Sequence, residues 1–161
     1  MRPPRDKVLG RDELVLHLQE LRSSGARVVF TNGCFDLLHA GHVETLLRAR
    51  CEGDALVVGL NSDASVRRLK GPRRPLTREE DRAFLVAALE CVDYVVVFPE
   101  DTPIETIRQL RPDVHVKGGD YRPEDLPEGE VVRSYGGRVV IAPVIPGLST
   151  TRLERALRED G

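Results

Sequence analysis

Hydrophobic residues gather along the chain in five short runs rich in β-branched side chains, at residues 28–31, 55–60, 94–98, 113–116 and 138–142. Runs of this length and composition are typical of buried strands. In several of the intervening segments, apolar residues recur at helical spacing. Strands that alternate with helices in this way predict a Rossmann-like, open parallel α/β sheet of about five strands with helices on both faces.

Three of the predicted helices have clear boundary signals. Residues 11–23 carry leucines on one face and end just before Gly25, a residue type suited to a helix C-terminus. Capping boxes at residues 77–80 and 102–105, the second with Pro103 at its first helical position, predict two later helices.

Two segments show little apolar periodicity. Residues 62–75 hold many cations around a Gly-Pro pair, and residues 122–129 hold two prolines among charged residues. We predict a loop for the first segment and a partly ordered excursion for the second. Neither has the character of a domain linker, so residues 1–161 are expected to form a single domain, with residues 1–26 as a helical extension packed on it.

Composition limits the classes of function. The chain has 161 residues, of which 40% are hydrophobic, and a formal net charge of −2. This length suits one globular domain, and the charge excludes a general basic surface for nucleic acid. Residues 1–12 are charged and contain proline, which indicates neither a secretory signal nor a membrane span. We therefore expect a cytoplasmic protein whose anion binding is local.

The three cysteines, Cys34, Cys51 and Cys91, lack the paired spacing of a zinc site. We interpret them as reduced thiols, with Cys51 and Cys91 packed in the interior and Cys34 in a turn that precedes a helix. Whether Cys34 has a chemical role stays open at this point.

Residues 31–42 carry the strongest chemical signal. They lie between the first predicted strand and a helix, whose free N–H groups and dipole attract an anion. His39 and His42 are three residues apart and share a face there, while Gly41 between them allows close backbone approach. Two histidines alone also fit ordinary surface residues. Together with Asn32-Gly33 in the same turn, they indicate a phosphate-binding site.

Three further segments follow predicted strands. Residues 67–74 hold five cations, which suit either a solvated surface loop or a loop that folds over a triphosphate at the carboxyl edge of the sheet. Residues 116–121 combine Lys117 with a Gly-Gly turn. Residues 146–152 open the last helix with hydroxyl side chains that either cap it or bind phosphate.

Taken together, these segments resemble the cytidylyltransferase-like nucleotidyltransferases, with His39-Ala40-Gly41-His42 as the HxGH signature. The Asn-Gly-Cys-Phe-Asp, Leu-Lys-Gly-Pro-Arg-Arg-Pro and Lys-Gly-Gly-Asp-Tyr segments are most similar to D-glycero-β-D-manno-heptose 1-phosphate adenylyltransferases, from about residue 27 to the C-terminus. The resemblance implies adenylyl transfer from ATP to the heptose 1-phosphate, giving ADP-heptose and pyrophosphate for lipopolysaccharide core or another heptose-containing glycan. Since about 26 residues precede the first strand, we expect the stand-alone form rather than the fusion to a ribokinase-like kinase found in some bacteria.

Other classes remain open at this stage. CTP-dependent cytidylyltransferases that act on glycerol 3-phosphate or phosphoethanolamine share the signature, the basic segment and the terminal Ser-Thr-Thr. A catalytically silent nucleotide-binding regulator would keep the pocket without turnover. A pantetheine-phosphate adenylyltransferase fits less well, because that group usually carries a different first signature or terminal motif.

The resemblance and the charge of the reaction assign roles to individual residues. We expect alignment and electrostatic stabilisation rather than general base catalysis. The residues expected to be catalytic are His39, His42, Lys70 and Arg82, the last two on the leaving pyrophosphate. Those expected to bind the nucleotide are Thr31, Asn32, Gly33, Cys34, Phe35, Gly41, Lys117, Gly118, Asp120, Gly147, Ser149, Thr150 and Thr151. Those expected near the sugar phosphate are Asp36, Asn61, Asp63 and Arg67. Mg²⁺ should accompany ATP, with Asp36 the nearest indirect ligand, and the protein should be a homodimer or higher oligomer.

Overall fold

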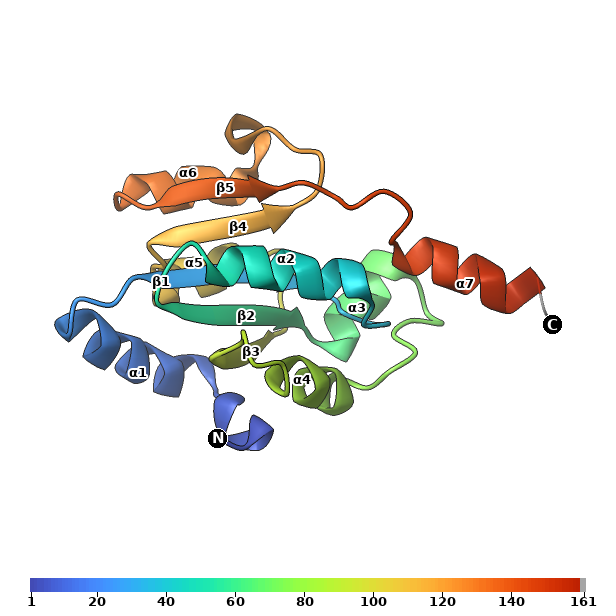
Figure 1. Ribbon diagram of the computed structural model, residues 1–161, viewed down its shortest axis with the longest axis horizontal. Helices are drawn as coiled ribbons and strands as arrows, with labels where there is room; N and C mark the ends of the chain where they lie inside the picture. The colour runs from blue at the N-terminus through green and yellow to red at the C-terminus, as the bar shows by residue number, and fades with distance from the viewer. Residues whose placement is uncertain (160–161) are drawn as a thin grey trace.

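A single sheet of five parallel strands forms the centre of the computed structural model, which describes residues 1–159 (Figure 1). The strands are β1 (Val28–Gly33), β2 (Ala55–Asn61), β3 (Tyr94–Phe98), β4 (Val114–Gly118) and β5 (Arg138–Ala142). Their order across the sheet is β3-β2-β1-β4-β5. The predicted fold class is confirmed.

The strand order reverses at β1, because β2 and β3 lie on one side of it and β4 and β5 on the other. The β1–β2 register runs over the whole of β1, from Val28 opposite Ala55 to Gly33 opposite Leu60. The β1–β4 register covers only two pairs, Val29 with Val114 and Phe30 with His115. The carboxyl ends of β1 and β4 therefore flank a crevice, which is where open α/β sheets bind ligands.

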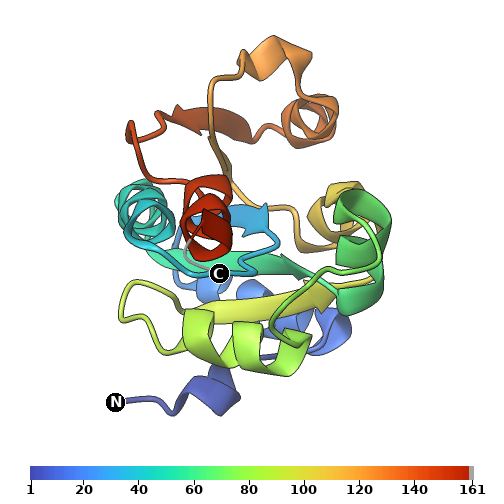
Figure 2. The same cartoon turned by 90° about the vertical axis from the view of Figure 1, so that its right-hand side faces the viewer.

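Helices cover both faces of the sheet, as Figure 2 shows for α2 on one side and α5 and α6 on the other. Successive strand residues point to opposite faces, so each face has its own buried cluster. One cluster joins the sheet to α2 (Ala40–Arg50) and α4 (Glu79–Ala87). The other joins it to α1 (Arg11–Ser23), α5 (Ile104–Leu110) and α6 (Pro127–Ser134). Both clusters are apolar and continuous with the strands.

The two segments predicted to be irregular contain helices. α3 (Asp63–Lys70) occupies most of the predicted loop, and Ser62 caps it by accepting a hydrogen bond from the Ser65 N–H at 3.2 Å. Its basic residues cluster in the last turn, where positive charges interact favourably with the helix dipole. The second segment contains the short 3-10 helix η2 (Pro123–Asp125) and the first residues of α6. Charge density favoured a loop too strongly in the first segment, and the second, predicted as a partly ordered excursion, contains more helix than its prolines suggested.

The two predicted capping boxes are wrong, although helices do begin nearby. α4 has Arg78 at its N-cap and α5 has Pro103, and neither makes a side-chain cap hydrogen bond. The backbone N–H of Thr77 is instead held by Asp36 at 3.0 Å, so this segment is fixed by a distant carboxylate. The interior packing predicted for Cys51 is also wrong, since Cys51 is exposed, while Cys91 is partly buried.

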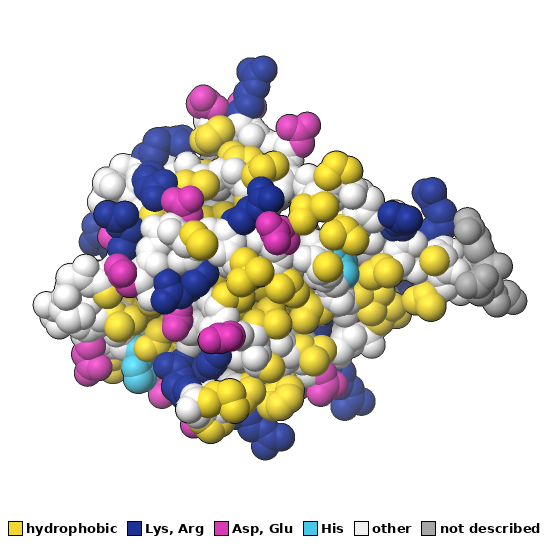
Figure 3. All heavy atoms as spheres, viewed as in Figure 1, with side chains coloured by type: hydrophobic (Ala, Val, Ile, Leu, Met, Phe, Trp, Pro, Cys, Tyr) yellow, Lys and Arg dark blue, Asp and Glu magenta, His cyan; other side chains and the backbone are white. Residues whose placement is uncertain are grey.

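The first and last described elements lie apart, η1 at the lower edge of the view and α7 at its right (Figure 1). At the N-terminus, η1 (Pro4–Lys7) leads to Leu9, whose N–H donates to Val95 O at 3.0 Å on the outer edge of β3. At the C-terminus, α7 (Thr150–Glu159) projects from the carboxyl edge of the sheet. Figure 3 shows hydrophobic side chains along it, and Leu153 and Leu157 are 42% and 69% exposed. Within residues 1–159, no helix has the length and apolar composition needed to cross a bilayer.

A close contact between neighbouring strands gives a stability prediction. A Cβ added at Gly59 in β2 would lie 2.6 Å from Phe30 Cζ and 3.2 Å from Phe98 Cε1. Gly59→Ala should therefore lower the free energy of unfolding by about 1–3 kcal/mol in urea denaturation. The penalty should shrink in a Phe30→Leu background, because leucine lacks the ring atom that the methyl group meets. Equal penalties in both backgrounds would contradict this packing.

Candidate nucleotide site

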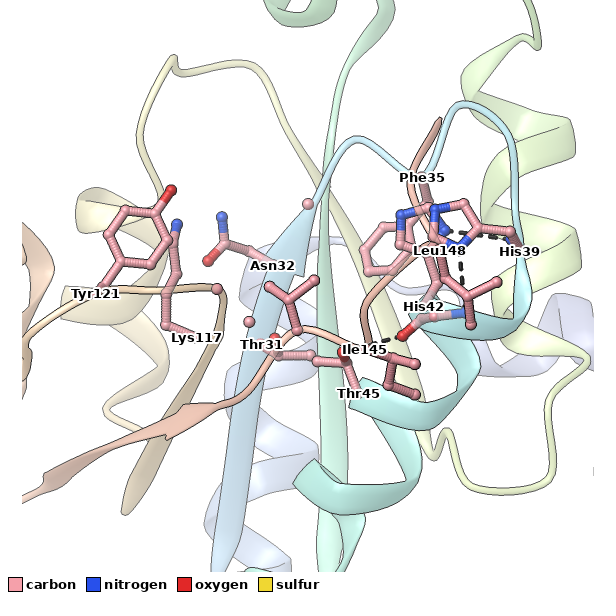
Figure 4. A pocket seen from close by; sticks show the side chains of 15 residues that line it. Thr31, Asn32, Phe35, His39, His42, Thr45, Lys117, Tyr121, Ile145 and Leu148 are labelled. Atoms are coloured by element: carbon pink, nitrogen blue, oxygen red, sulfur yellow. Dashed lines mark hydrogen bonds between the residues drawn. The ribbon is translucent and has the colours of Figure 1, made fainter. Parts of the chain in front are cut away.

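A cavity of about 310 Å³ opens at the carboxyl ends of β1 and β4, beside the N-terminus of α2 (Figure 4). It lies in the crevice where the strand order reverses. Nine of the residues expected at the site line it: Thr31, Asn32, Gly33, Phe35, His39, Gly41, His42, Lys117 and Gly118. The structure therefore brings two motifs from distant parts of the chain to one pocket.

The two histidines cap α2 reciprocally. His39 is the N-cap residue, and its Nδ1 accepts a hydrogen bond from the Gly41 N–H at 3.1 Å. The Nδ1 of His42 accepts from the His39 N–H at 3.3 Å. The rings stack with their centroids 3.8 Å apart. The proximity predicted from their spacing is confirmed, and both side chains perform the task that Ser and Glu perform in a capping box.

This capping fixes the chemical form of both rings. An Nδ1 that accepts a backbone hydrogen bond leaves the proton of a neutral imidazole on Nε2. Burial lowers the pKa of His39. Burial, followed by the neighbouring His39 and Lys70, lowers the pKa of His42 from 6.5 to about 4. Near pH 7 the pair consists of neutral rings with Nε2–H groups left to donate.

Gly41 and Phe35 hold the pair in place. A Cβ at Gly41 would lie 3.0 Å from the Cε1 and Nδ1 atoms of His39 and 3.1 Å from Leu148 Cβ, so any side chain there would press on the ring. Phe35 has a φ of +50°, a strained value for an aromatic residue and a frequent feature of functional turns. Its ring centroid lies 5.1 Å from that of His42. The strained backbone of this turn therefore places the Phe35 ring against the His42 ring.

Lys117, Tyr121 and Asn32 lie on the other side of the pocket, opposite the histidines and Leu148 (Figure 4). The Lys117 ammonium lies 5.6 Å from the centre of the Tyr121 ring. The Oδ1 atom of Asn32 is buried and finds no hydrogen-bond partner among the described residues. A buried acceptor without a partner is costly. The pocket thus offers uncharged donors on one wall and a cation on the other, beside a buried acceptor without a partner.

Asp36, expected near the substrate or a metal, is placed differently. Its side chain is fully buried, pairs with Arg74 at 2.7 Å and accepts from the N–H groups of Leu76 and Thr77 at 2.8 and 3.0 Å. Burial alone would raise the pKa of Asp36, but the bonds from Thr77, Leu76 and Arg74 hold it below its usual range. The carboxylate has no free side for substrate or Mg²⁺ and instead anchors residues 74–77.

Arg82, expected on the pyrophosphate, also lies inside the protein. Its guanidinium is buried and donates four hydrogen bonds, to Thr77 O at 2.9 Å, Cys34 O at 2.6 Å, Asn61 O at 2.9 Å and Asp63 Oδ1 at 2.7 Å. A buried guanidinium needs such acceptors, since burying an unpaired charge is expensive. Arg82, Asn61 and Asp63 do not line the pocket, and Arg82 instead holds the segments beside it together.

Three other expected residues do not line the pocket. Lys70 and Arg67 are exposed on α3. The positive charge of Lys70 contributes to the lowered pKa of His42. Burial raises the pKa of the Cys34 thiol, which argues against an activated nucleophile there.

The residues near the C-terminus fall on a second hollow. Gly147 and Ser149 line it together with His39. Ser149 Oγ accepts from the Arg152 N–H at 3.2 Å, so Ser149 caps α7, which is one of the two roles expected for these hydroxyl side chains. Thr150 and Thr151 are the first residues of that helix. Asp120 lies apart, in a shallow hollow with Gly119 and Val144.

Six lining residues were missed: Thr45, Gly119, Tyr121, Val144, Ile145 and Leu148. Thr45 lies one helical turn after Gly41 and donates to its carbonyl at 3.0 Å, a position that helical spacing alone indicates. Tyr121 lies inside the Lys-Gly-Gly-Asp-Tyr segment, but that motif did not predict its ring in the pocket wall. Val144 and Ile145 follow β5, and no polar signal marked them. Among residues 1–159, no three His, Cys, Asp or Glu side chains form a metal-binding cluster.

An open parallel sheet with a polar crevice at its reversal point and a helix N-terminus beside it defines an α/β nucleotide-binding protein. The chain belongs to the cytidylyltransferase-like family, which it matches over residues 30–155. It is 57% identical over 152 residues to the bifunctional protein HldE of Pelobacter propionicus and 59% identical to that of Syntrophotalea carbinolica. Each match covers 94% of this chain and 31% of the relative, so the chain spans about a third of the length of these proteins.

Two solved structures have folds similar to that of this chain. A lipopolysaccharide core biosynthesis protein from Thermoplasma volcanium is 28% identical, with a TM-score of 0.62, over 75% of this chain and 98% of that chain. A pantoate-β-alanine ligase from Francisella tularensis has a TM-score of 0.57 over 94% of this chain and 76% of that chain, but only 12% identity. The second likeness concerns the fold alone.

The state of the histidine pair is directly measurable. In imidazole ¹⁵N NMR spectra, His42 should remain a neutral Nε2–H tautomer at pH 6 and become protonated only near pH 4. The folded-state pKa lies below the usual value, so protonation opposes folding, and the protein should lose stability as the pH falls from 6.5 toward 4. Titration of His42 near its usual pKa, or a proton on Nδ1, would contradict the reciprocal cap.

Proposed function

We propose that the chain is a nucleotidyltransferase that transfers adenylyl from ATP to D-glycero-β-D-manno-heptose 1-phosphate, releasing pyrophosphate and forming ADP-heptose. The observation that carries the transfer chemistry is the pair of neutral Nε2–H donors at the N-terminus of α2. Family membership and more than 50% identity to the two HldE proteins support it. The heptose assignment is supported by the Asn-Gly-Cys-Phe-Asp and Lys-Gly-Gly-Asp-Tyr segments and by the likeness to the lipopolysaccharide core biosynthesis protein of Thermoplasma volcanium.

The reaction forms one P–O bond and breaks another. An oxygen of the sugar phosphate attacks the α-phosphorus of ATP, and the bond to the oxygen that bridges the α- and β-phosphates breaks. The nucleophile is already ionised at neutral pH, so no general base is required. Negative charge grows on the α-phosphoryl oxygens and on the leaving pyrophosphate. His39 and His42 stabilise this charge as preorganised donors, which is worth most in a site shielded from water.

Cations complete the phosphate environment. Lys117 holds phosphate on the wall opposite the histidines, and Lys70, at the end of α3, reaches the pyrophosphate end of ATP. Mg²⁺ enters with ATP as part of the substrate, bound mainly by phosphate oxygens and water. The engaged carboxylate of Asp36 supports this view, because its oxygens are already used by Arg74 and two backbone N–H groups.

The resemblance to the heptose 1-phosphate adenylyltransferases also supports a cytoplasmic location and assembly into a homodimer or higher oligomer. The exposed leucines of α7, Leu153 and Leu157, support self-association, since exposed apolar patches often mark contact surfaces. Light scattering on the purified chain tests this, and a monomer at micromolar concentration would contradict it.

The first functional prediction concerns the histidine that the structure buries more deeply. His42→Ala should lower kcat by about 10²-fold or more while the protein stays folded, because it removes a donor to charge that develops in the transition state. Steady-state kinetics with circular dichroism measures both quantities. His17→Ala, at an exposed histidine on α1, serves as the matched control. A folded His42→Ala protein with near-wild-type turnover would sink the role proposed for the pair.

The second functional prediction concerns substrate choice. Purified chain should convert ATP and the heptose 1-phosphate to a nucleotide sugar and should use CTP poorly, judged by kcat/KM, because the wrong base misplaces the α-phosphate. Pyrophosphate release across a panel of sugar and polyol phosphates decides this. CTP-dependent turnover of glycerol 3-phosphate or phosphoethanolamine, without turnover of the heptose, would favour the cytidylyltransferase alternative. No turnover with any pair would favour a silent regulator.

A further inference from the structure

A buried charged cluster lies behind the wall of the pocket that carries Lys117. His115 and Lys117 lie two residues apart on β4 and so point to the same face of the sheet. Glu128, in the first turn of α6, places Oε1 3.5 Å from the Nε2 of His115 and 3.5 Å from the Nζ of Lys117. His115 is fully buried, and its Nδ1 lies 3.3 Å from the carbonyl oxygen of Phe30. The cluster thus connects the interior of the sheet to the pocket.

The carboxylate of Glu128 is charged despite its burial. Only 5% of the residue is exposed, and an unpaired carboxylate there would be expensive. The hydrogen bond from His115 has the largest effect and lowers the pKa of Glu128. Burial raises this pKa, whereas a backbone hydrogen bond and the charge of Lys117 lower it further. Together they bring the pKa from 4.5 to about 2. Its place in the first turn of α6 also suits a negative charge. An ionised group is therefore fixed within reach of the lysine.

Lys117 is the one member of the cluster that reaches the pocket. Its side chain is 24% exposed, and its ammonium lies between the Glu128 carboxylate and the face of Tyr121. A lysine has a flexible four-carbon stem and behaves as a point charge with freely rotating donors. The buried Glu128 carboxylate restricts that freedom from behind, while the Tyr121 ring lies in the pocket wall itself.

We propose that Glu128 is a positioning residue of the site, which acts through Lys117 by holding its ammonium against the pocket wall, with His115 fixing the carboxylate from behind. The proposal rests on the proposed function in so far as Lys117 contacts a substrate phosphate. It adds a residue that no sequence motif marks, on a helix that does not line the pocket.

The charge of Glu128 allows an experiment to distinguish positioning of Lys117 from a simple effect on the local potential. Removing a negative charge beside an anion site should tighten phosphate binding if only the local potential matters. Losing the partner that holds Lys117 should weaken binding instead. The two effects have opposite signs, so the direction of the change separates positioning from simple electrostatics.

The test compares Glu128→Gln, Lys117→Ala and the double variant with the wild type. Both single variants should raise the same KM, for ATP or for the sugar phosphate, with Glu128→Gln raising it about tenfold and changing kcat much less. The double variant should have a KM no higher than that of Lys117→Ala alone, because the positioning effect of Glu128 requires the lysine. Glu130→Gln, at an exposed position on the same helix, is the control and should leave the KM values unchanged. A lowered or unchanged KM in Glu128→Gln, or additive effects, would overturn the proposal.

A second readout does not depend on turnover. The sequence has three lysines, Lys7, Lys70 and Lys117, so the Lys117 ammonium can be assigned in ¹H–¹⁵N spectra by comparison with Lys117→Ala. Held by Glu128, it should give an observable cross-peak that Glu128→Gln abolishes. If Glu128→Gln does not fold, Glu128→Asp keeps the charge, shortens its reach and should weaken the peak. Persistence of the peak would refute positioning, whereas a wild type without transferase activity that shows the peak would refute only the proposed function.

Discussion

The buried guanidinium of Arg82 is the contact on which the architecture of the site depends. It ties the turn after β1, the end of β2 and the segment before α4 to one point through Cys34 O, Asn61 O and Thr77 O. Its ion pair with Asp63 adds the start of α3. Three stretches that are separate in sequence, at residues 34, 61–63 and 77–82, therefore meet at the carboxyl edge of the sheet. Removing one partner of a buried charged network usually destabilises strongly, because the other partner is left uncompensated.

The protein separates the charges that build the site from the groups that face the ligand. Arg82 and Asp36 use their hydrogen-bonding capacity inside the protein, and Asp36 clamps the same segment that Arg82 holds through Thr77. The groups left at the α2 side of the pocket are uncharged Nε2–H donors, fixed by the backbone. Lys117 is charged, but Glu128 balances it. In the proposed function, a chain with a net charge of −2 would bind a polyanion through local geometry rather than overall potential.

The sequence predicted the parts of the structure that rest on local pattern. Five strands, the α1 boundary at Gly25 and the meeting of His39 with His42 follow from period and spacing. The strand runs also placed Lys117 and Gly118 at the carboxyl edge, where parallel strands end together. Composition misled at α3 and α6, which are rich in charge or proline. The Ser62 cap and the buried Val66 stabilise α3, and the buried Val132 stabilises α6.

The internal roles of Asp36 and Arg82 were not predictable in the same way. Each residue has the chemistry to bind a phosphate or a metal, and only the fold decides whether those groups face the pocket. Arg82 pairs with residues up to 48 positions away, and Asp36 with residues 38 to 41 positions away. Glu128 and Lys117 are neighbours in space, but nothing local in the sequence marks their contact. Such pairs follow from topology rather than from motif spacing.

The two histidines are central to the proposed function, because they present neutral donors to the α-phosphate of a bound nucleotide. A crystal structure with Mg²⁺ and a non-hydrolysable ATP analogue tests this most directly. The Nε2 atoms of His39 and His42 should lie about 3 Å from phosphate oxygens, while both Nδ1 atoms keep their backbone hydrogen bonds. Phosphates bound only along α3 and residues 71–74, with the histidine pair facing solvent, would contradict the claim.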